Sequence, residues 1–242
     1  MTRAHFGMAV WLLAVACSPV VPTSAAQGAS AGIDVKGLPL NFIAPKGNAS
    51  HYVALVMTGD GGFASLVTKL SDGLSDAGIG VVGFNSREWL SPAKTPDASA
   101  AAAVRAIRAG MARYHADSIV IVGYSRGADL APFVGNRLPA DLRSVLGGIA
   151  MFGMATYSNF EFHLIDLVKD TKRDSDVPIL PELLKLKGVP MVCVYGSDEK
   201  ESGCREVPQG LMAVDKREGG HHFDGADQSL ADVVLKLLHP SR

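Results

Sequence analysis

A serine between two glycines is the residue of this sequence whose type and setting point most clearly to chemistry. The motif Gly-x-Ser-x-Gly occupies residues 123–127, with Ser125 at its centre. An apolar run typical of a buried strand precedes it over residues 118–122, and a helical pattern follows over residues 128–137. A serine on a sharp turn from strand to helix exposes its hydroxyl, and flanking glycines allow close backbone approach. The sequence therefore predicts that Ser125 is a nucleophile.

A carboxylate and two histidines follow Ser125 in the chain order that α/β-hydrolases use. Residues 191–195 are an apolar run typical of a parallel strand, and Asp198 lies just beyond its end. His221 and His222 lie on a glycine-containing loop before the last helical pattern. A serine nucleophile needs an imidazole to accept its proton and a carboxylate to orient that ring. We predict the triad Ser125, Asp198 and His221, with His222 as the alternative base; the His-x-Phe spacing of many such hydrolases favours His221.

Backbone amides must stabilise the oxyanion that forms when a serine attacks a carbonyl group. In this class of site one amide belongs to the residue after the nucleophile, which is Arg126. A second comes from a loop after a neighbouring strand, and residues 58–63 form such a loop after the apolar run 52–57. Its glycines allow a positive φ, so Asp60 and Gly61 are the candidate donors. The alternative is that this loop is an ordinary tight turn.

The elements that must position these residues alternate along the chain. Strands are expected near residues 38–43, 52–57, 80–84, 118–122, 146–152, 190–195 and 211–214. Helical patterns cover residues 64–77, 97–114 and 128–137, and a last helix carries Leu230, Val233, Val234, Leu237 and Leu238. Such alternation predicts an α/β-hydrolase fold, a mostly parallel sheet with helices on both faces. Right-handed crossovers bring the serine, acid and histidine loops together at the carboxyl edge of the strands.

A small cap over the site is expected from residues 155–188, which are longer than a plain crossover. Residues 160–164 alternate apolar and polar side chains, which predicts a strand with one exposed face. Phe162 is our candidate for contact with an acyl chain of the substrate, although packing against the sheet is the more frequent fate of such residues. His163 is interpreted as structural or solvated, because the triad has a better base.

The N-terminus carries a basic residue, an apolar stretch and a small-residue cleavage site, which predict a secretory signal peptide over residues 1–26. The alternative is a lipoprotein signal over residues 1–16, after which Cys17 carries lipid. Either signal predicts a periplasmic or secreted protein. With the lipoprotein signal, the lipid on Cys17 would also anchor the protein to a membrane. Residues 33–242 are long enough for a single α/β domain with a large core.

Two cysteines, Cys193 and Cys204, lie beyond the signal. An even pair in an exported protein predicts a disulfide, which here closes a small loop around Asp198. The alternative is a buried Cys193 and a free Cys204 thiol, and geometry decides between the two.

Charge and motifs argue against several function classes. The formal net charge is −1 and no long basic run exists, so charge gives no reason to expect nucleic acid as a partner. The histidines lack the spacing partners of a metal site, and residues 59–62 lack the lysine and serine of a phosphate loop. We therefore expect neither a metal nor another cofactor.

Five short strings together resemble the VirJ/AcvB family of bacterial virulence proteins. They occupy residues 58–63, 123–127, 160–163, 195–200 and 219–223. The resemblance covers almost all of the chain beyond the signal, and the joint occurrence of the strings in this order is more specific than any one of them. The chain has the short, single-domain length of VirJ-like members and lacks the extra N-terminal region of AcvB-like ones. Phe63 stands where the family leads us to expect tryptophan.

The resemblance implies two functions of different classes. AcvB-like members are periplasmic hydrolases that cleave the ester between lysine and the lipid in lysyl-phosphatidylglycerol, whereas VirJ is associated with type IV secretion and with binding exported substrates. An intact triad has no role in a pure adaptor, which favours an ester hydrolase acting on lipid at the membrane surface. The alternative is an accessory protein whose partners are type IV secretion components.

Acidic residues on the site-facing loops suit a substrate that carries an ammonium group. Asp60, Glu199, Glu201 and Asp224 are candidates to accept hydrogen bonds from it. Solvated loop carboxylates are commoner, and Asp224 also has the place of a helix cap. Arg126 is expected to contact either a lipid phosphate or a nearby carboxylate.

Overall fold

A seven-stranded sheet forms from the apolar runs that alternate with helices along the chain, in the order β1-β3-β2-β4-β5-β8-β9. The pair β1 and β3 is antiparallel, and every other neighbouring pair is parallel. The strands are β1 (Leu40–Ile43), β2 (Tyr52–Met57), β3 (Gly80–Phe84), β4 (Ser118–Tyr124), β5 (Leu146–Phe152), β8 (Met191–Gly196) and β9 (Ala213–Arg217). Each of the seven expected strands has its counterpart, and the mostly parallel sheet is confirmed.

The computed structural model describes residues 1–2, 33–167, 172–225 and 229–239. One folded unit spans Ile33–Arg242. Cys17 and nearly all of the expected signal peptide lie outside the described residues. Within the described part, no helix combines the length and the apolar character that a membrane span requires.

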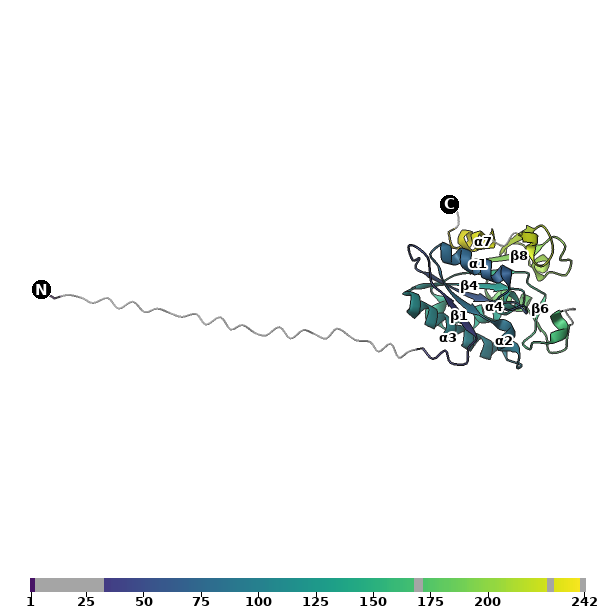
Figure 1. Ribbon diagram of the computed structural model, residues 1–242, viewed down its shortest axis with the longest axis horizontal. Helices are drawn as coiled ribbons and strands as arrows, with labels where there is room; N and C mark the ends of the chain where they lie inside the picture. The colour runs from purple at the N-terminus through teal and green to yellow at the C-terminus, as the bar shows by residue number, and fades with distance from the viewer. Residues whose placement is uncertain (3–32, 168–171, 226–228, 240–242) are drawn as a thin grey trace. The chain divides into compact units, whose positions relative to one another are not determined.

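Helices cover both faces of the sheet (Figure 1). They are α1 (Ser65–Asp76), α2 (Ser86–Leu90), α3 (Pro96–Tyr114), α4 (Arg126–Asn136), α5 (Ala140–Arg143), α6 (Leu180–Lys185) and α7 (Ser229–Leu238). The apolar side chains of α1 and α7 share one buried cluster, and those of α3, α4 and α6 share the other. Strand β2 contributes side chains to both clusters. Val53 and Leu55 face the side of α3 and α4, while Ala54 and Val56 face the opposite side.

The start of α3 follows the local rules for a helix N-terminus. The Thr95 side chain accepts a hydrogen bond of 3.1 Å from the Ala98 backbone N–H, and Pro96 occupies the first helical turn. The helix then presents small side chains to the sheet, including buried Ala102, Ala103 and Ala106. These small residues let α3 lie close against the sheet and beside α4, the helix that follows Ser125.

The segment between β5 and β8 forms the expected cap, with one correction. It contains a two-stranded antiparallel pair, β6 (Tyr157–Ser158) and β7 (Val177–Pro178), and the 3₁₀ turn η1 (Leu164–Leu167). The strand expected over residues 160–164 is absent from this described stretch. Phe160 is instead buried against Phe133, with ring centroids 5.1 Å apart, and so its packing overrides the alternating pattern.

Candidate active site

Ser125 sits in a strained turn between β4 and α4. Its backbone has φ of 51° and ψ of −122°, an unfavourable combination for a residue with a Cβ, and its N–H donates to the Phe152 carbonyl at 2.8 Å. A Cβ on Gly127 would run into the Met57 carbonyl, and one on Gly123 into the carbonyl of Gly127. The glycines are therefore required for the close approach of α4 to β2 and to β4, and the turn has the conformation of a nucleophile elbow.

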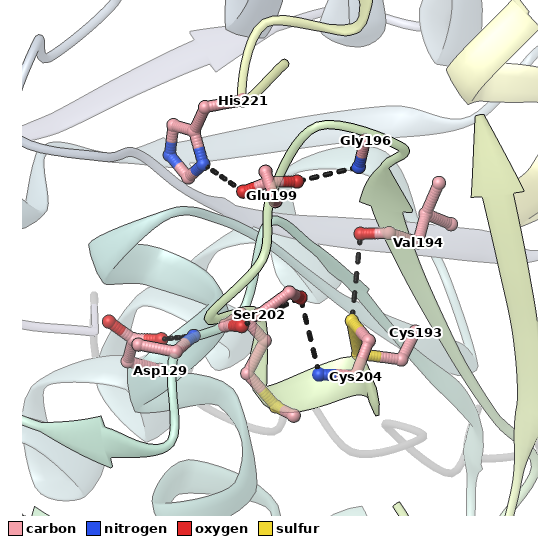
Figure 2. Close-up of a disulfide and its surroundings, with 10 residues drawn as sticks. Asp129, Cys193, Val194, Gly196, Glu199, Ser202, Cys204 and His221 are labelled. Carbon is pink, nitrogen blue, oxygen red and sulfur yellow. Dashed lines mark hydrogen bonds and ion pairs between the residues drawn. A yellow bond between two sulfur atoms is a disulfide. The ribbon is translucent and has the colours of Figure 1, made fainter. Parts of the chain in front are cut away.

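A histidine and a glutamate meet at the ends of the neighbouring strands. His221 Nδ1 lies 2.5 Å from Glu199 Oε1, and the Gly196 backbone N–H donates to Glu199 Oε2 at 2.6 Å (Figure 2). Because a carboxylate accepts the Nδ1 proton, the neutral His221 ring has its lone pair on Nε2. Ser125 and His221 line the same cavity. The arrangement brings a histidine oriented by a carboxylate to the cavity that the elbow serine also lines.

The residue that holds the histidine is therefore Glu199, and the prediction of Asp198 was wrong by one position. The Asp198 backbone N–H donates to the Gly219 carbonyl at 3.0 Å, and its exposed side chain accepts from the Ser197 hydroxyl at 3.1 Å. The Glu199 N–H closes a turn onto the Gly196 carbonyl at 3.0 Å, which folds its longer side chain back toward His221. Glu199 was expected to bind substrate, but its carboxylate is occupied by these contacts.

His222 has a different partner. Its Nδ1 lies 2.7 Å from the Tyr124 hydroxyl, which is also 3.3 Å from the His221 carbonyl oxygen. The His221 ring packs against Gly153, where a Cβ would lie 2.6 Å from His221 Cε1. Of the two candidate bases, His221 is thus the one that a carboxylate orients, and Tyr124 anchors the loop that carries both.

The charge state of Glu199 follows from its surroundings. Burial raises the pKa of its carboxyl, but the hydrogen bonds from His221 and from the Gly196 N–H, together with the nearby histidine charges, outweigh burial. The pKa of Glu199 lies below its ordinary value as a result. Glu199 is ionised at neutral pH, as a carboxylate that orients and stabilises a histidine base must be.

The cavity at the serine has a volume of about 830 Å³. It is lined by residues of four segments: Asp60, Gly61, Gly62, Ala64, Ser65 and Leu66; Tyr124, Ser125, Arg126 and Asp129; Gly153, Ala155 and Asp166; and His221, His222 and Asp224. A second cavity of about 400 Å³ shares Gly153, Ala155 and His221 with it and is also lined by Asp198 and Glu201. Among the described residues, no three His, Cys, Asp or Glu side chains are grouped so that they could hold a metal ion.

The loop after β2 lies directly against Ser125. A Cβ on Gly59 would be 2.9 Å from Ser125 Cβ and 3.4 Å from Ser125 Oγ. Asp60 and Gly61, the candidate oxyanion donors, follow Gly59 and line the cavity with Arg126. The structure thus brings both candidate segments to the serine, and their role in catalysis stays a prediction.

Arg126 joins two carboxylates that the sequence did not connect. Its guanidinium donates to Asp60 from Nε at 3.3 Å and from a terminal nitrogen at 3.0 Å, and it contacts Asp166 on η1 at 3.2 Å. Asp166 also accepts from Arg173 at 2.7 and 3.1 Å. Of the two contacts expected for Arg126, the structure shows the one with carboxylates. No local pattern marked Asp166 as a partner of Arg126, because the two residues are distant in sequence.

The remaining expected binding residues fall in different places. Asp224 lines the larger cavity and Glu201 the smaller one. Phe162 lines neither, and the prediction that it contacts substrate is not supported, because its ring packs under the Arg87 guanidinium at 5.0 Å. Asp129 was missed, although it lies four residues after Ser125 on the same helix, and its buried carboxylate accepts from the Ala155 N–H at 2.8 Å.

The disulfide between Cys193 and Cys204 is present, as predicted, with the two Cα atoms 5.5 Å apart. It closes the loop that leaves β8, carries Glu199 and returns to the sheet at η2 (Gly203–Glu206) (Figure 2). The Gly203 N–H donates to the Met154 carbonyl at 2.8 Å, which ties the returning end to the segment after β5. The covalent bond therefore limits how far the Glu199 loop can move from the sheet edge.

Comparison with known families matches residues 51–242 to the family described as "Bacterial virulence protein (VirJ)". None of the curated proteins matches the chain.

Solved structures with this fold are similar at low sequence identity. TT1662 from Thermus thermophilus has a TM-score of 0.56 and 18% identity, with 85% of this chain and 95% of that chain covered. Est1E from Butyrivibrio proteoclasticus has a TM-score of 0.54 and 13% identity, over 85% of this chain and 97% of that chain. A CE15 glucuronoyl esterase from Teredinibacter turnerae has a TM-score of 0.58 and 14% identity, over 83% and 69%. The α/β-hydrolase fold is confirmed.

Removal of the disulfide should destabilise the protein. The bond spans a sequence separation of 11 residues, and closing a loop of about that length stabilises a fold by about 3 kcal/mol. Replacing Cys193 and Cys204 together by alanine should lower the free energy of unfolding in urea by roughly that amount. Wild-type protein treated with a reductant is the matched control, since it loses the bond without a cavity. Unchanged urea midpoints in both samples would contradict the prediction.

Glu199 should make stability depend on acidity. The pKa of Glu199 is lower in the folded protein than in the unfolded chain, where it is about 4.3. The Glu199 carboxylate therefore adds to the free energy of unfolding above the unfolded pKa, and this stabilisation is lost as the pH falls through the lower folded value. Glu199→Gln should reduce the free energy of unfolding by about 1.5–3 kcal/mol near neutral pH. The difference from wild type should shrink below the unfolded pKa. Asp198→Asn, an exposed neighbour, is the control, and an equal effect of the two substitutions would exclude this role for Glu199.

Proposed function

This chain belongs to the VirJ family of bacterial virulence proteins, and on that premise we propose that it is a serine ester hydrolase. The observation that carries the proposal is a strained elbow serine and a carboxylate-paired histidine that line one cavity. Ser125 is the nucleophile, His221 the general base and Glu199 the residue that orients it. The α/β-hydrolase fold supports the proposal by presenting these residues on loops at the carboxyl ends of β4, β8 and β9.

Acylation begins when Ser125 Oγ attacks the carbonyl carbon of the ester and transfers its proton to His221 Nε2. The carbonyl π electrons move to oxygen, and amides of Arg126 and of the Asp60 and Gly61 loop donate to the oxyanion. As the tetrahedral intermediate collapses, the bond to the alcohol oxygen breaks and His221 returns the proton to that oxygen. The alcohol leaves and an acyl ester of Ser125 remains.

Deacylation repeats the sequence with water. His221 takes a proton from the water as its oxygen attacks the acyl carbon, and the second tetrahedral intermediate expels Ser125 Oγ. The proton on His221 passes to Ser125, which restores the free enzyme and releases a carboxylic acid. Glu199 remains a carboxylate throughout and stabilises the imidazolium in both halves of the reaction.

The proposed substrate is an aminoacyl-phospholipid such as lysyl-phosphatidylglycerol, cleaved by an exported enzyme at the membrane surface. The resemblance to AcvB-like members suggests this substrate, and the carboxylates around the two cavities support it. Asp60 and Asp166 are already paired with Arg126, and Asp129 accepts from the Ala155 N–H. This leaves Asp224 at the larger cavity to attract an ammonium group. Asp198 and Glu201 line the smaller cavity together with Lys200.

A fluorophosphonate probe tests the nucleophile. Such probes react with serines that a neighbouring base activates, so wild-type protein should be labelled and Ser125→Ala should not. The wild type should also release lysine from lysyl-phosphatidylglycerol, and the variant should lose this activity. A folded wild-type protein that neither reacts with the probe nor cleaves the lipid would overturn the hydrolase assignment. An accessory protein that binds type IV secretion components would then be the better interpretation of the family membership.

Asp224 should favour cationic over neutral esters. Asp224→Asn should lower kcat/KM for a lysyl ester by about 2- to 5-fold, the range of an exposed ion pair, and leave an ester without an amino group unaffected. Asp232→Asn is the matched control, because Asp232 lies exposed on α7 and lines neither cavity. Equal loss for both esters would mean that Asp224 does not contact an ammonium group.

A further inference from the structure

The Arg126 side chain connects the two segments that flank the serine on its oxyanion side. It starts from the first residue of α4 and is only 6% exposed, while Asp60, on the loop after β2, is 16% exposed. A guanidinium that is buried to this degree must be paired with a carboxylate. Because its N–H donors lie in one plane, it fixes both the orientation of the partner carboxylate and its distance. The contact with both Asp60 oxygens therefore ties the loop to the elbow in one orientation.

The middle of the loop needs such a tie, whereas its end is held by Phe63, which packs against the buried cluster of α1 and α7. Residues Gly59, Gly61 and Gly62 carry no Cβ, and the backbone hydrogen bonds from Gly62 to Gly59 and from Ala64 to Gly62 are internal to the loop. Thr58 holds its start, through its N–H to the Phe84 carbonyl at 3.0 Å. In the described part of the chain, the Asp60 carboxylate is what links the middle of this loop to α4 by hydrogen bonds.

The charge of Arg126 itself is already compensated. Two carboxylates, those of Asp60 and Asp166, lie within 3.3 Å of its nitrogens. A guanidinium shared in this way adds little net positive potential for an oxyanion, so its contribution is geometric. Asp166 fixes the other side of the guanidinium, because the Asp166 side chain is only 1% exposed and is held by Arg173 as well.

From these contacts we infer that Asp60 and the Arg126 side chain are positioning residues for the oxyanion hole. They set the distance between the Arg126 amide and the amides of the Asp60 and Gly61 loop, and the cap residue Asp166 braces them from the opposite side. The inference rests on the proposed hydrolase function and goes beyond it, since it assigns a role to side chains that do not touch the reacting atoms. A displacement of catalytic groups by about 1 Å is enough to lower a rate about 100-fold.

The test is the rate of fluorophosphonate labelling of Ser125, together with kcat and KM for an ester that the wild type cleaves. Asp60→Asn should slow labelling and lower kcat by roughly 10- to 100-fold, with KM within about 2-fold of wild type. Arg126→Lys keeps the positive charge but loses the planar guanidinium that contacts both Asp60 oxygens. It should slow labelling and lower kcat in the same way as Asp60→Asn. The double variant should be no slower than the slower single variant, because both act through one contact.

The matched control is Asp141→Asn, which also removes an aspartate from an arginine, but in the exposed pair of Asp141 with Arg108. It should label at the wild-type rate. Thermal unfolding of every variant shows whether slow labelling comes from displacement of the loop in a folded protein or from loss of the fold. Asp60→Asn or Arg126→Lys that is folded and labels as fast as wild type would overturn this inference alone. A wild-type protein that does not label would instead overturn the hydrolase function and the inference with it.

Discussion

The close approach of α4 to β2 is the constraint on which the site depends. Gly127 lies so near the Met57 carbonyl that no side chain fits between them, and this contact holds the turn at Ser125 in a conformation that the residue would otherwise avoid. Because Met57 ends β2, the same contact places the following loop against the serine. The two apolar clusters on either side of the sheet stabilise this arrangement and compensate the local strain.

The glutamate and the histidine of the site lie on the loops that follow β8 and β9, the last two strands of the sheet. Strand β8 runs parallel beside β5 and β9 runs parallel beside β8, so the glutamate and histidine loops leave the sheet at the same edge as Ser125. Hydrogen bonds between the two loops, such as Asp198 N–H to the Gly219 carbonyl, align them. The disulfide and the Tyr124 hydroxyl then restrict each loop separately. His221 is thus held by contacts from several segments of the chain, whereas Ser125 is held by one turn.

The sequence predicted the strands well because buried parallel strands are short apolar runs with clear ends, as in residues 52–57 and 191–195. It also predicted the turn between strand and helix at Ser125, and of the two histidines it favoured the one that a carboxylate contacts; their catalytic roles stay a prediction. It misassigned the acid because Asp198 and Glu199 are adjacent carboxylates, and only the turn from Gly196 to Glu199 decides which of them faces His221. The contacts of Arg126 could not be predicted, since Asp60 and Asp166 lie far from it in sequence and no periodic pattern links them.

The shared guanidinium of Arg126 has a consequence for how relatives of this protein vary. A relative that replaces Arg126 leaves the Asp60 carboxylate without its partner, whereas Asp166 keeps Arg173. An unpaired, largely buried carboxylate is unfavourable, so positions 60 and 126 should change together in evolution while positions 166 and 173 form a second covarying pair. Because Asp166 also contacts Arg126, the cap residues Asp166 and Arg173 should be retained wherever Asp60 and Arg126 are retained.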